Sequence, residues 1–233
     1  MKKIMTLLVA MVGVFGQAYS DDQVTTASTA DMLRQGMTWE VSSHPGVVDP
    51  DHPIPDPAVF FRIDGYYEWK GKLYSVLRKA SIYRNNATYG LRCEDDKIYA
   101  RFLDREDDDE FLAYDFTLKP GEGTYVTYMF DGRCHTLYQQ YYVKCVSIER
   151  KIVCNIEYEF MNIECYWDET CKELMSFKPM YWIKGIGSRN GVIEQILFSL
   201  GSHYILERVY YSPDIIYDSA VSDQESVRAE DQY

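Results

Sequence analysis

Apolar and polar side chains alternate along most of the chain in short runs separated by glycines or polar pairs. A period of two is typical of β-strands with one buried face. Met37, Trp39 and Val41 alternate in this way and mark the first strand. Further strands are expected at residues 59–64, 66–69, 72–79, 88–94, 97–103, 111–116, 124–130, 134–148, 152–165, 180–183, 192–198, 203–211 and 215–217. Residues 192–198 also fit a short helix.

The connections between these strands are short and rich in turn residues, such as Gly65, Lys70-Gly71, Asp95-Asp96 and Asp131-Gly132. Parallel neighbours need crossovers of a dozen or more residues, so the strands are expected to run antiparallel, largely as a meander. About a dozen strands have to curl, close or split into two layers. The predicted fold class is therefore all-β, as a curled sheet, a sandwich or a partial barrel.

The first twenty residues have the pattern of a secretory signal peptide. Lys2 and Lys3 precede an apolar run at residues 4–15, and Ala18-Tyr19-Ser20 offers small residues for cleavage. The run is shorter than the roughly 20 apolar residues that span a bilayer. We therefore expect cleavage near Ser20, no membrane span in the mature chain, and a secreted, periplasmic or cell-envelope location.

The mature chain is expected to contain one folded domain. Residues 21–57 are predicted to be a flexible segment with a short first strand and a proline-rich loop, and residues 21–30 to be disordered. The prolines between residues 42 and 57 exclude helix and a central strand there. Residues 58–217 are predicted to form the antiparallel domain, and residues 218–233 a disordered acidic tail.

Charge and composition restrict the classes of binding partner that we expect. Without Lys2 and Lys3, 22 basic side chains face 36 acidic ones, so the net charge falls from −12 to −14. So acidic a surface repels nucleic acid and anionic membranes, and neither is expected as a partner. The chain holds 21 tyrosines, which favour strands and support the β fold. No cofactor is predicted.

Three segments carry a family resemblance: residues 89–99 (YGLRCEDDKIY), 112–121 (LAYDFTLKPG) and 181–188 (YWIKGIGS). Together with Trp39 and the Gly71–Tyr74 spacing, they resemble a family of uncharacterised secreted proteins of anaerobic Gram-negative bacteria from gut and mouth. The family motifs read LREEDGKVY, LLYDFSL and WIEGIGS. The resemblance covers residues 32 to 217 and implies an antiparallel β fold and an envelope or extracellular location.

The sequence departs from the family pattern at three positions. Cys93, Glu122 and Lys184 stand where the family usually has Glu, Asp and Glu. No catalytic residues are established for the family, so the resemblance assigns none to this chain.

Six cysteines in an exported chain suggest disulfides. A hairpin turn centred between Glu149 and Arg150 would place residues whose numbers sum to 299 opposite each other, at a spacing that a disulfide accepts. Cys145–Cys154 and Cys134–Cys165 have this sum and are the first two candidate pairs, which leaves Cys93–Cys171 as the third. Cys165–Cys171 competes as a short loop, and buried unpaired thiols remain an alternative.

Clustered acids offer two further hypotheses. The run at residues 104–110 contains the weak Ca²⁺ candidates Asp104, Asp107, Asp108 and Asp109, but it lacks EF-hand spacing, and a solvated hairpin tip is favoured. Glu94, Asp95 and Asp96 suggest paired carboxylates for glycan hydrolysis, although a turn is favoured there. No metal site is predicted.

The tyrosine surplus suggests an aromatic binding face. Adjacent aromatic residues place rings on both faces of a strand, so one ring of each pair is a candidate for exposure. The candidates are Tyr66, Tyr67, Trp69, Tyr141, Tyr142, Tyr210 and Tyr211. The alternative is that one ring enters the core while the other shields the sheet.

These observations favour a secreted, non-catalytic envelope or extracellular module that binds a protein or a glycan through an aromatic face. One alternative is a glycan-acting hydrolase that uses paired carboxylates from Glu94, Asp95, Asp96 or the 104–110 loop. Another is a structural envelope protein whose sheet edges assemble with copies of itself. We do not expect the chain to be an enzyme.

Overall fold

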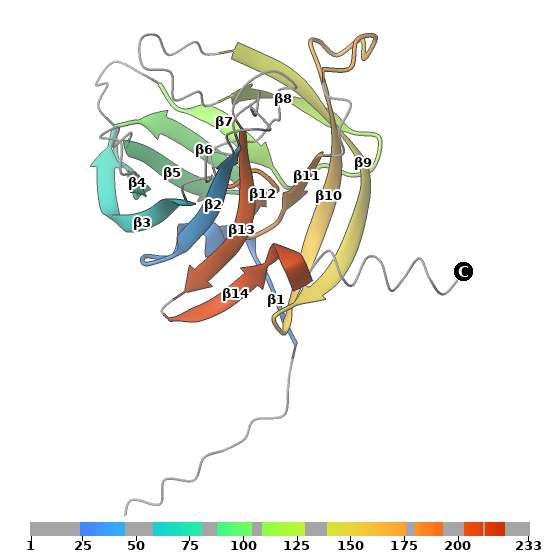
Figure 1. Cartoon of the computed structure of the whole chain (residues 1–233). Helices are drawn as coiled ribbons and strands as arrows, with labels where there is room; N and C mark the ends of the chain where they lie inside the picture. The colour runs from blue at the N-terminus through green and yellow to red at the C-terminus, as the bar shows by residue number, and fades with distance from the viewer. Residues whose placement is uncertain are drawn as a thin grey trace, which may run out of the picture.

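A computed structural model describes residues 24–44, 58–80, 88–103, 109–128, 139–175, 180–192, 203–211 and 213–221. Its strands form two sheets around one hydrophobic core (Figure 1). The predicted all-β, mainly antiparallel fold is confirmed. Among the described strands, the one parallel pair joins β1 (Thr25–Thr26) to β10 (Ile156–Tyr166).

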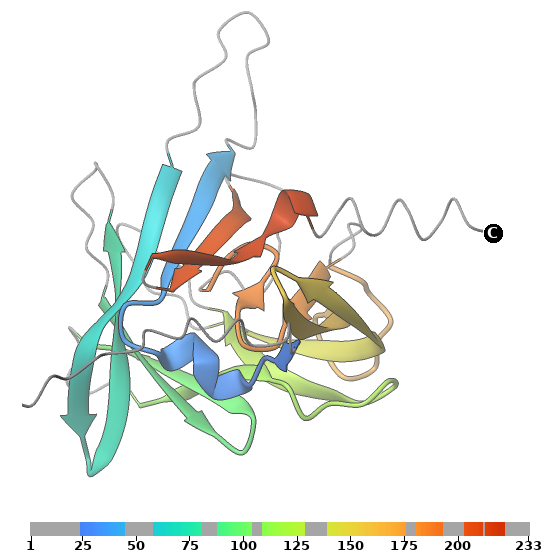
Figure 2. The same cartoon turned by 90° about the horizontal axis from the view of Figure 1, so that it is seen from below.

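The larger sheet has eight strands in the order β14-β13-β2-β3-β4-β5-β6-β7, and it curls strongly (Figure 2). From β2 to β7 each strand pairs with the next one in sequence, which confirms the meander there, and β13 returns to pair with β2. The strands are β2 (Thr38–His44), β3 (Ala58–Trp69), β4 (Lys72–Ala80), β5 (Thr88–Glu94), β6 (Lys97–Phe102), β7 (Phe111–Asp115), β13 (His203–Tyr211) and β14 (Asp214–Asp218). The two strands predicted at 59–64 and 66–69 form the single strand β3, which contains a bulge.

The smaller sheet is built on the long hairpin of β9 (Gln139–Val153) and β10. Its order is β12-β11-β10-β9-β8, with β1 beside β10. The remaining strands are β8 (Gly123–Tyr128), β11 (Met180–Ile183) and β12 (Gly187–Ser188). β8 pairs with β9 only from Gln139 to Lys144, so the second half of β9 extends beyond it.

The core between the sheets contains large aromatic side chains. Trp39 on β2, Tyr114 on β7 and Trp182 on β11 are fully buried. The Trp39 indole nitrogen donates a hydrogen bond to the Ile186 carbonyl at 2.8 Å, and the Tyr114 ring packs edge-on against Trp182 at 5.2 Å. The buried indole N–H of Trp39 therefore has a partner where burial would otherwise be costly.

Two predicted turns are confirmed. Asp95 and Asp96 connect β5 to β6 with φ angles of 51° and 57°, and Lys70 and Gly71 connect β3 to β4 with 49° and 73°. Positive φ at both central residues is typical of the two-residue hairpin turn that matches the twist of the strands. Asp95 and Asp96 thus occupy a turn, as the sequence favoured.

The prediction for the central hairpin is wrong. We expected its turn between Glu149 and Arg150, but β9 continues to Val153, and Cys154 and Asn155 form the turn with φ angles of 52° and 61°. Asn tolerates this left-handed conformation better than most residues do. Arg150 faces solvent within the strand, where its Nη2 contacts Glu159 Oε1 of β10 at 2.9 Å.

The new register separates the cysteines, so the predicted disulfide Cys145–Cys154 is wrong. Cys145 lies opposite Ile163, and Cys154 lies in the turn. Cys93, Cys165 and Cys171 have free thiols, which contradicts Cys93–Cys171 and the short loop Cys165–Cys171. The proposed pair Cys134–Cys165 also contains the free Cys165. Its other member, Cys134, lies outside the described residues.

The start of the domain differs from the prediction of disorder at residues 21–30. Thr25–Thr26 form β1, and the 3₁₀ helix η1 (Thr29–Leu33) follows. This segment packs against Gly185, where a side-chain Cβ would lie 2.9 Å from the Ser28 carbonyl oxygen. A glycine at 185 therefore allows the N-terminal segment to approach β10 and β11.

Several sequence predictions fall outside the described residues. They concern the signal peptide at 1–20, the proline-rich loop after residue 44, residues 193–198 of the predicted strand 192–198, and the tail after residue 221. In the part of the chain that the structure describes, no helix has the length and apolar character needed to cross a membrane.

Candidate functional site

The loop that follows β10 borders a hollow of about 310 Å³ that is open to solvent. Leu174 forms a bridge with Tyr166 at the end of β10, and the Met175 amide donates a hydrogen bond to the Cys165 carbonyl at 2.8 Å. These contacts close residues 167–173 into a tight loop. The hollow is lined by Trp167, Asp168, Thr170, Lys172 and Glu173, and we call it the Trp167 hollow.

Trp167 supplies the flat apolar wall of the hollow. Half of the residue's surface is exposed (50%), which is unusual for so large an aromatic side chain. Its ring packs against the buried Tyr141 of β9, with ring centroids 5.7 Å apart. Tyr141 thus supports the inner side of the indole, while the outer surface of the indole stays open to solvent.

The other side of the loop is tied to β8. Tyr125 accepts a hydrogen bond from the Glu169 amide at 3.3 Å, and its ring packs edge-on against Tyr142 at 5.3 Å. Tyr142 in turn lies over Gly123, where a Cβ atom would be 2.5 Å from the tyrosine oxygen. An aromatic ring that covers a strand glycine is a known device for fixing strand register.

The polar groups of the hollow are ordered by a local turn. Asp168 Oδ1 accepts hydrogen bonds from the Thr170 amide at 2.8 Å and from the Thr170 hydroxyl at 2.5 Å. These bonds lower the pKa of the fully exposed Asp168 carboxyl, so it is ionised at neutral pH. The hollow therefore combines an exposed indole with carboxylates, an ammonium group and a hydroxyl.

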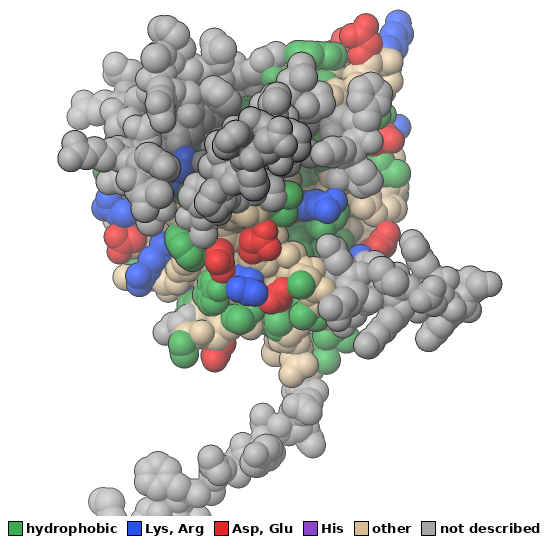
Figure 3. Space-filling model, viewed as in Figure 1, with side chains coloured by type: hydrophobic (Ala, Val, Ile, Leu, Met, Phe, Trp, Pro, Cys, Tyr) green, Lys and Arg blue, Asp and Glu red, His purple; other side chains and the backbone are tan. Residues whose placement is uncertain are grey.

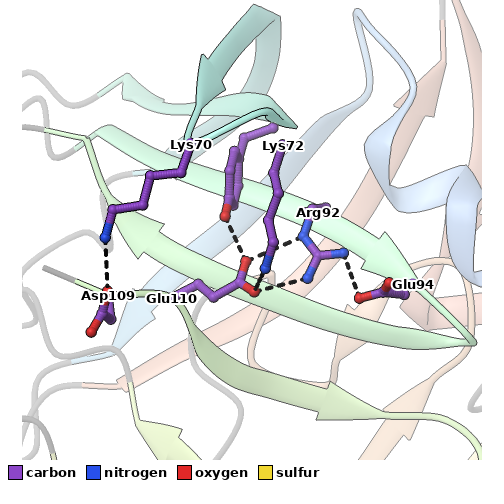
Figure 4. Close-up of polar contacts among 7 residues, drawn as sticks. Lys70, Lys72, Arg92, Glu94, Asp109 and Glu110 are labelled. Carbon is purple, nitrogen blue, oxygen red and sulfur yellow. Dashed lines mark hydrogen bonds and ion pairs between the residues drawn. The ribbon is translucent and has the colours of Figure 1, made fainter.

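A second group of polar side chains lies on the face of β4 and β5 opposite the main core. The Glu110 carboxylate accepts hydrogen bonds from Tyr74 Oη at 2.5 Å, Arg92 Nη2 at 2.9 Å and Arg92 Nε at 3.2 Å, and also from Lys72 Nζ (Figure 4). We call Lys72, Tyr74, Arg92 and Glu110 the Glu110 cluster. Four donor atoms on one carboxylate leave it little capacity for an external ligand.

The electrostatics of the Glu110 cluster indicate a fixed ion pair. Burial on its own raises the pKa of Glu110, but hydrogen bonds from Arg92, Lys72 and Tyr74 outweigh it and lower the pKa to about 2. Burial and the bond to Glu110 raise the pKa of Tyr74 to about 12. The cluster therefore keeps its charges through the whole physiological range.

Trp69, one of the predicted binding residues, lies beside this cluster and is engaged by cations of the chain itself. The Arg101 guanidinium lies 3.7 Å from the Trp69 ring centroid and the Lys70 ammonium 4.0 Å. Arg101 is buried on β6. These cation–π contacts hold the indole against the sheet.

The other predicted aromatic residues lie on three strands of two sheets. Tyr66 and Tyr67 on β3 are both exposed, Tyr141 on β9 is buried, and Tyr142 is half-buried. On β13, Tyr210 donates a hydrogen bond to Glu40 at 2.6 Å, and Arg34 lies 5.5 Å from the ring centroid of Tyr211. Tyr141 and Tyr142 are thus the two that lie beside the Trp167 hollow.

The predicted carboxylates are mostly paired with cations. Asp96 Oδ2 accepts a hydrogen bond from Lys184 Nζ at 2.9 Å, which lowers the pKa of Asp96, and Glu94 contacts Arg92 at 2.8 Å. Asp109 contacts Lys70 at 3.2 Å, while Asp104, Asp107 and Asp108 lie outside the described residues. Within the described ranges, no group of three or more His, Cys, Asp or Glu side chains is arranged to hold a metal ion.

On the face that Figure 3 shows, charged side chains of both signs are interspersed among the described residues, despite the net charge of −12. Sequence reasoning missed Trp167, and it considered Glu110 only as the last residue of the acidic run 104–110. The signal for Trp167 was its position immediately before the polar stretch Asp168–Glu173, where a core residue is not expected. Glu110 had no local signal, because its partners lie 18 to 38 residues away in sequence.

No protein-family model matches the chain, and no curated protein matches it. Among solved structures, the chain is similar to a "putative exported protein with YmcC-like fold" from Bacteroides fragilis. The match covers 81% of this chain and 100% of the other, with 12% identity and a TM-score of 0.31. So loose a similarity carries no information about function.

Proposed function

We propose that this protein is an exported, non-catalytic binding module that takes up neutral glycans in the Trp167 hollow. The observation that carries the proposal is the exposed Trp167 ring beside Asp168, Thr170 and Glu173 in one hollow. A flat indole packs on the apolar face of a sugar ring, and carboxylate and hydroxyl groups accept or donate hydrogen bonds to its hydroxyls.

The preference for neutral glycans follows from charge. Asp168 and Glu173 line the hollow against the single cation Lys172, and the whole chain is strongly acidic. Acidic polysaccharides would meet repulsion both at the hollow and at long range. Neutral sugars avoid this repulsion while keeping the ring contact and the hydrogen bonds.

The electrostatics favour binding over glycan hydrolysis. A hydrolase needs one carboxylic acid with a raised pKa that protonates the leaving oxygen. The pKa of Asp168 in the hollow is lowered, and so are those of Asp96 and Glu110. Carboxylates that stay ionised suit hydrogen bonding to sugar hydroxyls.

Affinity electrophoresis of the mature chain through gels that contain neutral or acidic polysaccharides tests the proposal. We expect retardation by at least one neutral polysaccharide and none by the acidic ones. Trp167→Ala should abolish the retardation, because it removes the stacking surface.

Tyr66→Ala is the matched control, because Tyr66 is similarly exposed (55%) but lies on β3, away from the hollow. This variant should migrate like the unaltered protein. Equal loss of retardation in both variants, or no retardation by any neutral polysaccharide, would contradict the proposal.

A further inference from the structure

In the part of the chain that the structure describes, the second half of β9 forms an open edge of the smaller sheet. β8 ends its pairing with β9 at Lys144, and among the described strands residues 146–153 pair only with β10. Figure 1 shows the β9–β10 hairpin at the outer margin of the molecule. An open strand edge presents backbone donors and acceptors to any further strand.

The turn determines which backbone groups face outward. Val153 and Ile156 flank the two-residue turn and form its hydrogen-bonded pair. Hydrogen-bonded and non-hydrogen-bonded pairs alternate along an antiparallel ladder, so the N–H and C=O groups of Ile148, Arg150 and Ile152 point away from β10. Three alternate residues of this edge therefore have backbone groups that can pair with another strand.

The side chains at this edge include exposed apolar groups. Val146, Ile148 and Ile152 have 47%, 36% and 44% of their surface exposed. No proline interrupts residues 146–153, and Arg150 is the one charged residue in the alternating series that contains Val146, Ile148 and Ile152. Natural proteins usually protect such an edge, so its exposure points to a partner strand.

We propose that this edge pairs with the same edge of a second copy, antiparallel, with Arg150 at the two-fold axis. An axis perpendicular to the sheet keeps side chains on their own face, so only residues whose numbers have an even sum can lie opposite each other. With a sum of 300, Ile148 lies opposite Ile152 of the second copy, and Glu149 lies opposite its Lys151. Each of these pairs occurs twice.

Both kinds of pair are favourable. Opposed isoleucines bury apolar surface, and opposed Glu and Lys attract each other. Arg150 would face Arg150 of the second copy, but its guanidinium is held by Glu159 of its own chain. The neighbouring registers, with sums of 298 and 302, would oppose Glu149 with Glu149 and Lys151 with Lys151, so these charges favour the sum of 300.

Sedimentation velocity of the mature chain, in the presence of a thiol reductant, tests this interface. The reductant prevents the exposed Cys154 from linking chains covalently. We expect a concentration-dependent monomer–dimer equilibrium. Glu149→Lys and Lys151→Glu should each raise the dimer dissociation constant at least about tenfold, because each places like charges opposite each other.

A mixture of the two variants provides the decisive control. In the proposed register, the new lysine of the first variant meets the new glutamate of the second. The unaltered Lys151 of the first likewise meets the unaltered Glu149 of the second. The mixture should therefore dimerise at concentrations at which each variant alone stays largely monomeric.

Arg150→Pro should also block pairing without removing a hydrogen bond to β10. Far-ultraviolet circular dichroism checks that every variant is folded. A wild-type chain that stays monomeric at 100 µM (about the highest practical concentration), or a mixture that does not dimerise, overturns the proposal.

Discussion

The Glu110 cluster and the Trp167 hollow both bring charged groups close to aromatic rings, but they differ in what those groups contact. At the Glu110 cluster, the carboxylate is bound by Arg92, Tyr74 and Lys72 of the same chain, and neighbouring Trp69 is engaged by Arg101. At the Trp167 hollow, the indole is half exposed, and the polar side chains border open space. The first arrangement fastens strands together, whereas the second leaves its groups available to a ligand.

The largest expected effect comes from breaking the Glu110 cluster. Glu110→Ala removes the acceptor that the largely buried Arg92 and Tyr74 share, so we expect a loss of about 3 kcal/mol in the free energy of unfolding. Urea denaturation measures it. Glu94→Ala is the control: Glu94 also contacts Arg92 but is exposed, and its loss should cost less than about 0.5 kcal/mol. Equal effects of the two variants would contradict a structural role for the cluster.

The Glu110 cluster should also make the free energy of unfolding depend on pH. The folded-state pKa of Glu110, about 2, lies below the ordinary value of 4.5. Its stabilisation is therefore complete above pH 4.5 or so and is lost as the pH falls toward the folded value. The stability difference between wild type and Glu110→Gln should shrink by about 2 kcal/mol from pH 7 to pH 3. A difference that stays constant over this range would show that the carboxylate charge is not responsible.

A smaller effect is expected beneath the Trp167 hollow. In Gly123→Ala, the new Cβ would lie 2.6 Å from the Val143 carbonyl oxygen as well as against the Tyr142 ring. We expect a loss of about 1.5 kcal/mol in thermal or urea unfolding, because the backbone oxygen cannot move aside freely. The neighbouring Thr124→Ala, which adds no atoms, should change stability by less than about 0.5 kcal/mol. If Gly123→Ala lowers stability no more than Thr124→Ala does, the packing of the Tyr142 ring does not require a glycine at this position.

The sequence predicted local features well where a local cause existed. The turns at Lys70-Gly71 and Asp95-Asp96 were predicted from residues that accept positive φ. The strand that contains the buried Trp39 was predicted from the alternation of Met37, Trp39 and Val41. The central hairpin was misplaced because the polar run at residues 149–151 resembled a turn. In the structure that run stays in β9, supported by cross-strand contacts such as Arg150–Glu159.

The sites were harder to predict because they depend on contacts between distant segments. Glu110 meets Tyr74 and Arg92 only after β4, β5 and the start of β7 are assembled. Trp167 becomes a binding candidate because Tyr141 supports it and Leu174 closes its loop, and neither contact has a sequence signature. The tyrosine pairs were chosen by composition, which does not distinguish an exposed ring from one that is already packed.

The central claim is that the open hollow, and not the Glu110 cluster, binds the glycan. Tryptophan fluorescence during titration with neutral oligosaccharides tests it most directly, because Trp39 and Trp182 are fully buried. We expect a saturable change in emission for the wild type and for Trp69→Phe, and none for Trp167→Phe. A saturable change that persists in Trp167→Phe, or one that vanishes in Trp69→Phe alone, would contradict it.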